Sequence, residues 1–408
     1  MSAPTLIPFR VIRLAIQMLV GDTTKWFGVV LGIFLSTFLI THMLGMFNGM
    51  MQRTYGMVTD IPLADIWVMD PAVEYVDGPT GLPPTALQRV RGVEGVDWAV
   101  PIMMVTLPVR LPGGVHRSAM VIGLDDATFV GGPDNMIEGR LESLRQLDTV
   151  VVDTISANSL LRTPLDPRAH PLPDRSSPQD APTRPLRIGD EFYVNDHRMV
   201  VSGFARLGPQ FLARPMLFTT YSRALQITPP QRNLMSYVLV RARTGVDPED
   251  LARSINNATG LRARTARQFS DDTYWYYVRT TGVVDRIAFM VGIGIIVGVS
   301  VSALLLYLFT AENAWAYAIL TAMGAQRHTI TLMVIVQALV CGSIGYGLGI
   351  GASCAVGHFF PTDTLPYLAI GWTLVGSGAV VLAICMIASV LSLGKVFSVE
   401  PAMAFQRR

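Results

Sequence analysis

The side chains that could do chemistry are scattered along this chain and form no known catalytic pattern. Acids are neighbours at Asp125 and Asp126, Asp190 and Glu191, and Asp271 and Asp272, where loop or helix-cap roles are commoner than acid–base chemistry. His116, His170 and His197 stand alone, and the H-E-x-x-H, G-x-S-x-G and C-x-x-C patterns do not occur. We therefore predict no catalytic, cofactor-binding or metal-binding residues.

A phosphate-binding loop for ATP is also missing. Its usual form, G-x-x-x-x-G-K-[ST], needs a lysine, and the chain has two. Lys25 follows Thr24 instead of a glycine, and Lys395 follows Gly394 but precedes Val396. We therefore predict that the chain is not an enzyme. If ATP and Mg²⁺ drive it, they bind to a separate partner chain.

The composition places part of the chain in a bilayer, because half of the residues are apolar and only 15% are charged. Four charge-free runs reach the roughly 20 residues that a helix needs to cross a hydrocarbon core of about 30 Å. These runs are Trp26–Gln52, Ile287–Ala311, Thr329–Thr362 and Thr364–Gly394, from which we predict membrane helices over 26–52, 283–311, 329–360 and 368–394. The net charge of +2 gives no reason to expect nucleic-acid binding.

Basic residues predict the orientation of these spans. Arg10, Arg13 and Lys25 precede the first span, Arg327 lies between the second and third, and Lys395, Arg407 and Arg408 follow the fourth. Because basic loops stay on the cytoplasmic side, we place the amphipathic segment 1–25, the loop 312–328 and the tail 395–408 in the cytoplasm. The polar middle, 53–282, and the short loop 361–367 are then periplasmic.

The polar middle predicts a large α/β domain between the first and second spans. Short β-like runs include Val100–Arg110, Thr149–Val152 and Tyr237–Arg241, and helical pieces are Pro84–Val90 and Asp247–Ala258. The proline-rich stretch 163–185 is expected to be a disordered insertion. The cluster Tyr274–Tyr277 precedes the second span, and we expect it at the outer membrane interface. No cysteine occurs in this region, since Cys341, Cys354 and Cys385 all lie in apolar runs, where we expect them to pack.

Small residues recur every fourth position in three of the spans. Such a pattern lets helix backbones approach closely, although glycine is common in membrane helices in any case. The helix-packing candidates are Gly28 and Gly32 in the first span, Gly294 and Gly298 in the second, and Gly345 and Gly349 in the third. The contact they make could lie within one bundle or between two copies of the chain.

Several stretches resemble the MacB/FtsX-like ABC transporter permeases. The signature-like region runs from Ala311 to Gly351, and within it the A-Y-A-x-L-x-A-M-G run of 316–324 looks closest to the stand-alone DevC type. The ending S-V-E-P-A-M-A-F, 398–405, is similar to the family's P-A-x-x-F ending. The resemblance implies a four-helix permease with a 1+3 arrangement and a MacB-like periplasmic core domain in the bacterial inner membrane.

The same resemblance implies the partners. These are a separate ABC ATPase, a second copy of the chain in a homodimer, an HlyD-type periplasmic adaptor and a TolC-like outer-membrane channel, besides membrane lipids. Such complexes are thought to export cargo by mechanotransmission across the membrane. Two alternatives remain: an FtsX-like regulator that acts on a periplasmic cell-wall hydrolase, or a membrane scaffold without ATPase coupling. The cargo stays open.

The loop 312–328 is the candidate coupling helix that docks on the ATPase. Its apolar residues exceed what a short solvated loop should expose, and Gly324 is placed to end the helix. The candidate docking residues are Glu312, Trp315, Tyr317, Leu320, Met323 and Gly324. The family usually has an acid directly before the Y-A-x-L run, where this chain has Ala316. Burial of these side chains in the lipid interface is the alternative.

Overall fold

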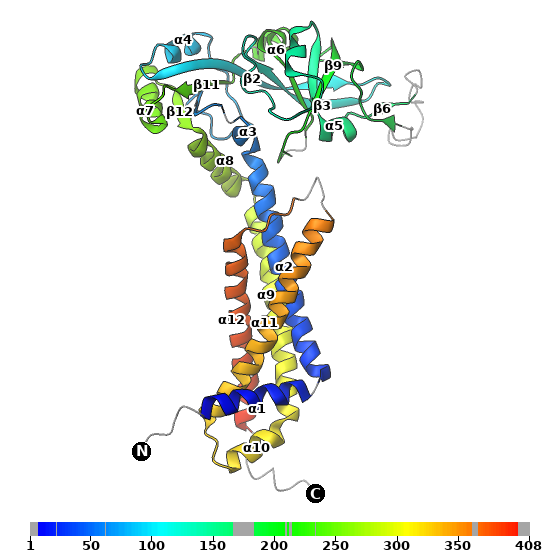
Figure 1. The fold of residues 1–408 in the computed structure, drawn as a ribbon, viewed down its shortest axis with the longest axis vertical. Coiled ribbons are helices and arrows are strands. Elements are labelled where there is room, and N and C mark those ends of the chain that lie inside the picture. Colours follow the sequence, from blue (N-terminus) through cyan, green and yellow to red (C-terminus); the bar gives the residue numbers. More distant parts are fainter. Residues whose placement is uncertain are drawn as a thin grey trace. The chain divides into compact units, whose positions relative to one another are not determined.

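The computed structural model describes residues 7–21, 23–61, 63–165, 183–208, 210–211, 214–232, 234–360 and 366–398. Its contacts divide the chain into a helical unit, Met1–Met50 with Thr281–Arg408, and an α/β unit, Met51–Thr280. Figure 1 shows the helices and strands of both units in the order of the chain.

The helical unit contains four long apolar helices, one before the α/β unit and three after it (Figure 1). Each is long and apolar enough to cross a membrane: residues Trp26–Thr54 of α2, Val283–Glu312, Arg327–Phe359, and Gly371–Leu393 of α12. The predicted 1+3 fold class is therefore confirmed. The helices of this unit are α1 (Ile7–Gly21), α2 (Thr23–Thr54), α9 (Val283–Glu312), α10 (Ala314–Ala322), α11 (Arg327–Phe359) and α12 (Gly371–Ser398).

One side of α2 packs closely on α9 through small residues. A Cβ atom added at Gly32 would lie 2.7 Å from Val301 Cγ1, and one at Gly28 would lie 3.4 Å from Leu305 Cδ1. On α9, a Cβ at Gly294 would lie 3.3 Å from Ile40, and a Cβ at Gly298 would overlap the Ser36 hydroxyl. The Ser36 hydroxyl donates a hydrogen bond across the contact to the Gly294 carbonyl, at 2.8 Å.

The other side of α2 packs on α11 in the same way. A Cβ at Gly345 would lie 2.9 Å from Ile33 Cβ and 3.0 Å from the Val30 carbonyl oxygen. A Cβ at Gly349 would lie 2.6 Å from Thr37 Cβ. All six candidate packing glycines therefore lie at contacts between helices of one chain.

The segment 366–370, before α12, is extended where we predicted that the fourth span would begin at residue 368. Its backbone lies along α2: the Leu368 N–H donates to the Gly45 carbonyl at 2.9 Å. A side chain at Gly45 or Gly357 would overlap the Tyr367 ring, which also stacks on the His42 ring. The backbone hydrogen bond to α2 and the position of the Tyr367 ring keep residues 366–370 from forming a helix. Helix α12 therefore begins at Gly371.

The α/β unit is built on a ten-stranded mixed sheet in the order β12-β1-β11-β2-β3-β10-β5-β9-β4, with β8 pairing to β2 and β9. The long strand β2 pairs with β11 through its first half and with β3 through its second half, so it joins two lobes. The strands are β1 (Ile66–Met69), β2 (Val96–Arg110), β3 (His116–Leu124), β4 (Met136–Glu138), β5 (Thr149–Asp153), β6 (Thr163–Pro164), β7 (Thr183–Arg184), β8 (Glu191–Val194), β9 (His197–Ala205), β10 (Met216–Thr220), β11 (Tyr237–Ala242) and β12 (Arg262–Thr265).

Helices and apolar clusters cover the faces of this sheet. One cluster packs α4 and α7 on β1 and β11, and a second packs α6 on β2 and β3. A third cluster lies on the opposite face of β2 and contains Met57, Met104 and Phe269. The helices are α3 (Gly56–Thr59), α4 (Thr85–Arg91), α5 (Thr154–Asn158), α6 (Tyr221–Ile227), α7 (Pro248–Thr259) and α8 (Ala266–Thr280), with 3₁₀ turns at Leu141–Arg145 and Pro230–Arg232.

Two predictions for this unit need correction. The ends of the stretch 163–185 are ordered, because Thr163–Pro164 pairs with Thr183–Arg184 and the Arg162 guanidinium donates to the Thr183 carbonyl at 2.7 Å. Residues 166–182 lie outside the described residues. Tyr277, predicted at the membrane interface, is instead buried in the α/β unit, where its ring contacts Phe211 and its hydroxyl donates to Asp77.

The close contact between α2 and α11 predicts a difference between two glycines of α11. Gly345→Ala should lower the free energy of unfolding by about 1–3 kcal/mol, because the new methyl group meets Ile33 and the Val30 backbone. Gly347→Ala is the matched control, since that position is exposed and a Cβ there meets nothing within 4 Å. Thermal unfolding in detergent, followed by tryptophan fluorescence, measures both variants. Equal unfolding midpoints would contradict the packing.

Candidate functional site

Helix α10 and the ends of its neighbours form the candidate site. The polypeptide leaves α9 at Asn313, whose side-chain amide donates to the Phe309 carbonyl at 2.9 Å, and α10 begins at the next residue. Its sequence, AWAYAILTA, contains four alanines and a leucine, the residues that favour helix most. Gly324 ends the helix with a φ of 96°, a left-handed conformation that glycine adopts without steric cost.

The Gly324 turn has the hydrogen bonds of a Schellman motif. The Ala325 N–H donates to the Leu320 carbonyl at 2.9 Å and the Gly324 N–H donates to the Thr321 carbonyl at 3.0 Å. After it, α11 begins at Arg327. The turn of Gly324, Ala325 and Gln326 therefore connects the end of α10 closely to the start of the third span.

The inner face of α10 is anchored by a buried polar contact with two other helices. The Tyr317 hydroxyl donates to Gln337 Oε1 on α11 at 3.3 Å, and Gln337 Nε2 donates to the Ala15 carbonyl on α1 at 3.1 Å. Gln337 and Ala15 are 0% exposed and Tyr317 is 2% exposed. Burial raises the pKa of Tyr317 to about 12, so its hydroxyl keeps its proton and remains a donor at neutral pH.

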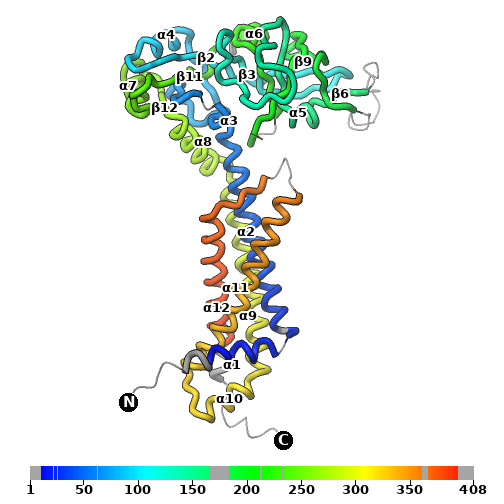
Figure 2. The backbone as a smooth tube through the Cα atoms, viewed as in Figure 1, coloured from blue at the N-terminus to red at the C-terminus, as the bar shows by residue number. Residues whose placement is uncertain are grey.

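Apolar side chains surround this three-helix contact, which we call the Gln337 junction. They come from α1, α10, α11 and the end of α12, and they include Ile330, Met333, Val334 and Leu393. Figure 2 shows that α1 crosses the same end of the helical unit at which α10 lies. The junction therefore ties the two non-spanning helices to the third and fourth spans.

The outer face of α10 is open. Trp315 is 62% exposed and Met323 is 71% exposed, and Glu312 and Gly324 are exposed as well. Leu320 is half-buried against the junction cluster. The prediction that Tyr317 belongs to the exposed docking face is wrong, because its ring is buried and its hydroxyl is bonded to Gln337.

Sequence reasoning missed Gln337 and the carbonyl of Ala15. A signal for Gln337 was present: it is an amide in the middle of a charge-free apolar run, where a polar group needs a partner. Its partners could not be found from the sequence, since Ala15 and Tyr317 lie 322 and 20 residues away along the chain.

Three of the neighbouring acids that stood out in the sequence have structural roles in the α/β unit. Asp125 accepts from the Thr128 N–H at 3.0 Å, Asp190 is bonded by both Nη atoms of Arg184, and Asp272 accepts from Arg262 and Arg264. His170 lies outside the described residues. Among the residues that the structure describes, no three His, Cys, Asp or Glu side chains come together as a metal site would require.

Comparisons with known proteins match two parts of the chain to families. Residues 26–258 match the family described as the MacB-like periplasmic core domain, and residues 288–401 match the FtsX-like permease C-terminal family. A search of curated proteins gives no match.

Two solved structures are similar to parts of the chain. The extracellular domain of the noncanonic ABC-type transporter YknZ from Gram-positive bacteria is 13% identical, with a TM-score of 0.32, over 50% of this chain and 98% of that one. The periplasmic region of MacB from Actinobacillus actinomycetemcomitans is 14% identical, with a TM-score of 0.35, over 55% of this chain and 97% of that one.

Removing the amide of Gln337 should loosen α1. In Gln337→Leu the Tyr317 hydroxyl and the Ala15 carbonyl lose their buried partner, which costs about 1–3 kcal/mol. Hydrogen exchange followed by mass spectrometry should then show faster exchange of the amides in residues 11–21. Gln17→Leu, an exposed position on α1 itself, is the control and should exchange as the wild type does. Unchanged protection of α1 in Gln337→Leu would show that the junction does not hold it.

Proposed function

This chain belongs to the MacB/FtsX-like ABC transporter permease family, and from that membership we propose that it couples a separate ATPase to export across the cell envelope. The observation that carries the proposal is the open outer face of α10, a short helix between two spans whose inner face is fixed at the Gln337 junction. A rigid helix with exposed Trp315 and Met323 is suited to transmit force from a docked partner.

The proposed path runs from α10 into the spans. Force on α10 reaches α11 through the Tyr317–Gln337 hydrogen bond and reaches α9 through the continuous turn at Asn313. Both helices pack on α2 through the glycine contacts described above. Helices α2 and α9 are in turn joined to the α/β unit by the chain itself, at Tyr55 and at residues 281–282. Movement of α10 would therefore change the positions of the two helices that carry that unit.

The proposed orientation follows the basic residues. Both termini and α10 lie in the cytoplasm of a bacterial cell, where the ATPase and its ATP and Mg²⁺ are found, and the α/β unit is periplasmic. The chain acts as a homodimer with two ATPase subunits. A periplasmic adaptor of the HlyD type and a TolC-like channel continue the route outward, as in the stand-alone DevC-type permeases.

Export is preferred to control of a cell-wall hydrolase for one reason. The match to the MacB-like periplasmic core domain covers residues 26–258, a region that includes most of the α/β unit. Purification of the complex distinguishes the two functions. An adaptor and a channel that co-purify with the chain support export, and a hydrolase or its activator that co-purifies supports the alternative. A chain that brings down no ATPase would be a scaffold.

Docking through α10 predicts that two exposed side chains bind the ATPase. Trp315→Ala should weaken the association by about 2 kcal/mol, or roughly 30-fold in Kd, because a central exposed aromatic residue is a typical binding hot spot. Met323→Glu should weaken it by placing a charge in the contact. Pull-down of the ATPase and ATPase activity in nanodiscs measure both variants.

The matched control is Trp372→Ala. Trp372 is 63% exposed, as Trp315 is, but it lies in the first turn of α12, at the other end of the helical unit. Its loss should leave the association unchanged. Membrane insertion and thermal unfolding should be the same in all three variants. If Trp315→Ala and Met323→Glu bind the ATPase as tightly as Trp372→Ala does, α10 is a connector in the lipid interface.

A further inference from the structure

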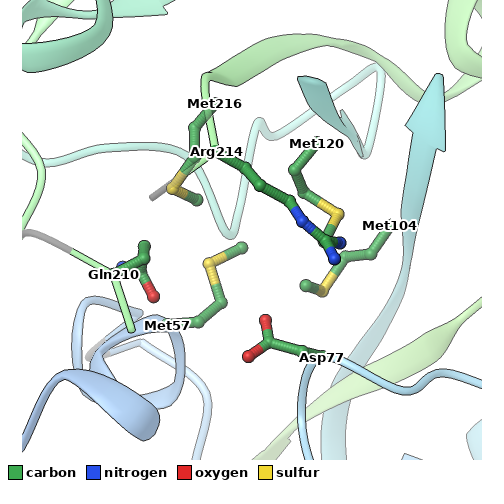
Figure 3. Close-up of a pocket in the computed structure, with 7 residues that line it drawn as sticks. All are labelled: Met57, Asp77, Met104, Met120, Gln210, Arg214 and Met216. Carbon is green, nitrogen blue, oxygen red and sulfur yellow. The ribbon is translucent and has the colours of Figure 1, made fainter. Parts of the chain in front are cut away.

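The α/β unit contains a small cavity with an unusual lining. It has a volume of about 20 Å³, enough for one ion or one water molecule. Four of the seven side chains that line it are methionines (Figure 3). The lining residues are Met57, Met104, Met120 and Met216 with Asp77, Gln210 and Arg214. We call this space the methionine cavity.

The strand register explains why three of the methionines meet. In the parallel pair β3–β10, Met216 lies directly beside Met120, and in the antiparallel pair β2–β3, Met120 lies opposite Thr106. Met104 is two residues before Thr106, so it is the diagonal neighbour of Met120 on the same face of the sheet. Met57 reaches the same space from α3. Figure 3 shows the four thioether side chains turned into it.

The chemistry of this lining selects a soft ligand. Thioether sulfur is polarisable and prefers Cu(I)-like ions to hard cations such as Mg²⁺ or Ca²⁺. A periplasmic site also favours methionine over cysteine, because thiols there are prone to disulfide formation and thioethers are not. The α/β unit has no cysteine.

One acidic and one basic side chain line the cavity, Asp77 and Arg214. Asp77 accepts a hydrogen bond from the Tyr277 hydroxyl at 2.8 Å, and the positive charge of Arg214 also favours the ionised form of its carboxylate. Burial raises its pKa above the ordinary value for Asp. Because the charges of Asp77 and Arg214 are opposite, the four neutral thioethers are the groups of this lining that favour a soft ion.

We propose that the methionine cavity is a binding site for a soft monovalent metal ion, Cu(I) or Ag(I). The thioether sulfurs are the ligands, and the Asp77 carboxylate lies in the same lining, where its negative charge attracts the ion. Arg214 also lines the cavity; its Nη1 donates to the Thr106 hydroxyl at 3.3 Å, and its positive charge opposes the bound ion. Two side chains of opposite charge therefore change the affinity of the site for the ion in opposite directions. It does not depend on the docking of an ATPase.

The chain offers a matched pair of methionines for the test. Met103 and Met104 are neighbours in β2 and both are buried, but their side chains point to opposite faces of the sheet, so they belong to different apolar clusters. Met104→Leu removes a sulfur from the cavity and nearly keeps the side-chain volume. Met103→Leu makes the same chemical change away from the cavity.

Silver ions are the probe, because Ag(I) needs no reductant. The full-length chain is placed in nanodiscs with Cys341, Cys354 and Cys385 replaced by alanine, so that thiols do not compete. Methionine methyl groups carry ¹³C and are assigned by single Met→Leu variants. One equivalent of Ag(I) should shift the four cavity methyl resonances together, and Ca²⁺ should shift none. Competition with a chromophoric chelator gives the affinity, for Cu(I) as well.

Variants of the lining residues test whether the methionine cavity is the site at which Ag(I) binds. Met104→Leu should weaken Ag(I) binding about tenfold or more, and Met103→Leu should leave it unchanged. Asp77→Asn should weaken Ag(I) binding and Arg214→Gln should tighten it, and both variants keep all four thioethers. These two variants test the site even if Met104→Leu does not fold. If the cavity methyls do not shift at one equivalent, or if the Met103 and Met104 variants bind alike, the cluster is core packing only and the proposal is wrong.

Discussion

The rest of the helical unit depends on how closely α2 approaches its two neighbours. In a bilayer there is no hydrophobic gain when one apolar helix meets another, so packing contacts and a few hydrogen bonds must hold the bundle together. Gly32 and Gly298 permit that contact with α9, and Gly345 and Gly349 permit it with α11. Because backbone atoms such as the Val30 carbonyl lie within 3.0 Å of where a Cβ would stand, even one methyl group requires the helices to separate.

Two polar contacts lie near the two ends of the bundle. Gln337 would be costly in an apolar helix, but it is bonded to both Tyr317 and Ala15. At the other end, the Tyr367 hydroxyl lies 2.9 Å from the Ser353 hydroxyl, and its ring occupies the space that Gly45 and Gly357 leave open. One contact fixes α1 and α10, and the other fixes the segment before α12.

Features that follow from local pattern could be predicted from the sequence. Long charge-free runs gave the four spans, glycine at every fourth position pointed to helix contacts, and Gly324 was expected to end α10. Features that depend on distant partners could not be predicted. From the sequence alone Tyr317 is expected to be exposed, because its hydrogen-bond partner Gln337 lies on another helix. The methionine cavity exists only because β2, β3 and β10 are adjacent in the sheet. Strand β12 could not be predicted either, since Arg262–Thr265 alternates too briefly to show a strand pattern.

The proposed function requires that ATP-driven movement of α10 reach the α/β unit through the bundle. The most direct measurement is a pulsed electron-resonance distance between the two copies of the proposed homodimer, each spin-labelled at Leu147→Cys, a site that is 84% exposed. The distance is compared between the nucleotide-free and the ATP-trapped complex with the ATPase. We expect a shift on trapping that disappears in Trp315→Ala and persists in Trp372→Ala. An unchanged distance in a complex that binds and hydrolyses ATP, or a shift that survives in Trp315→Ala, would contradict transmission through α10.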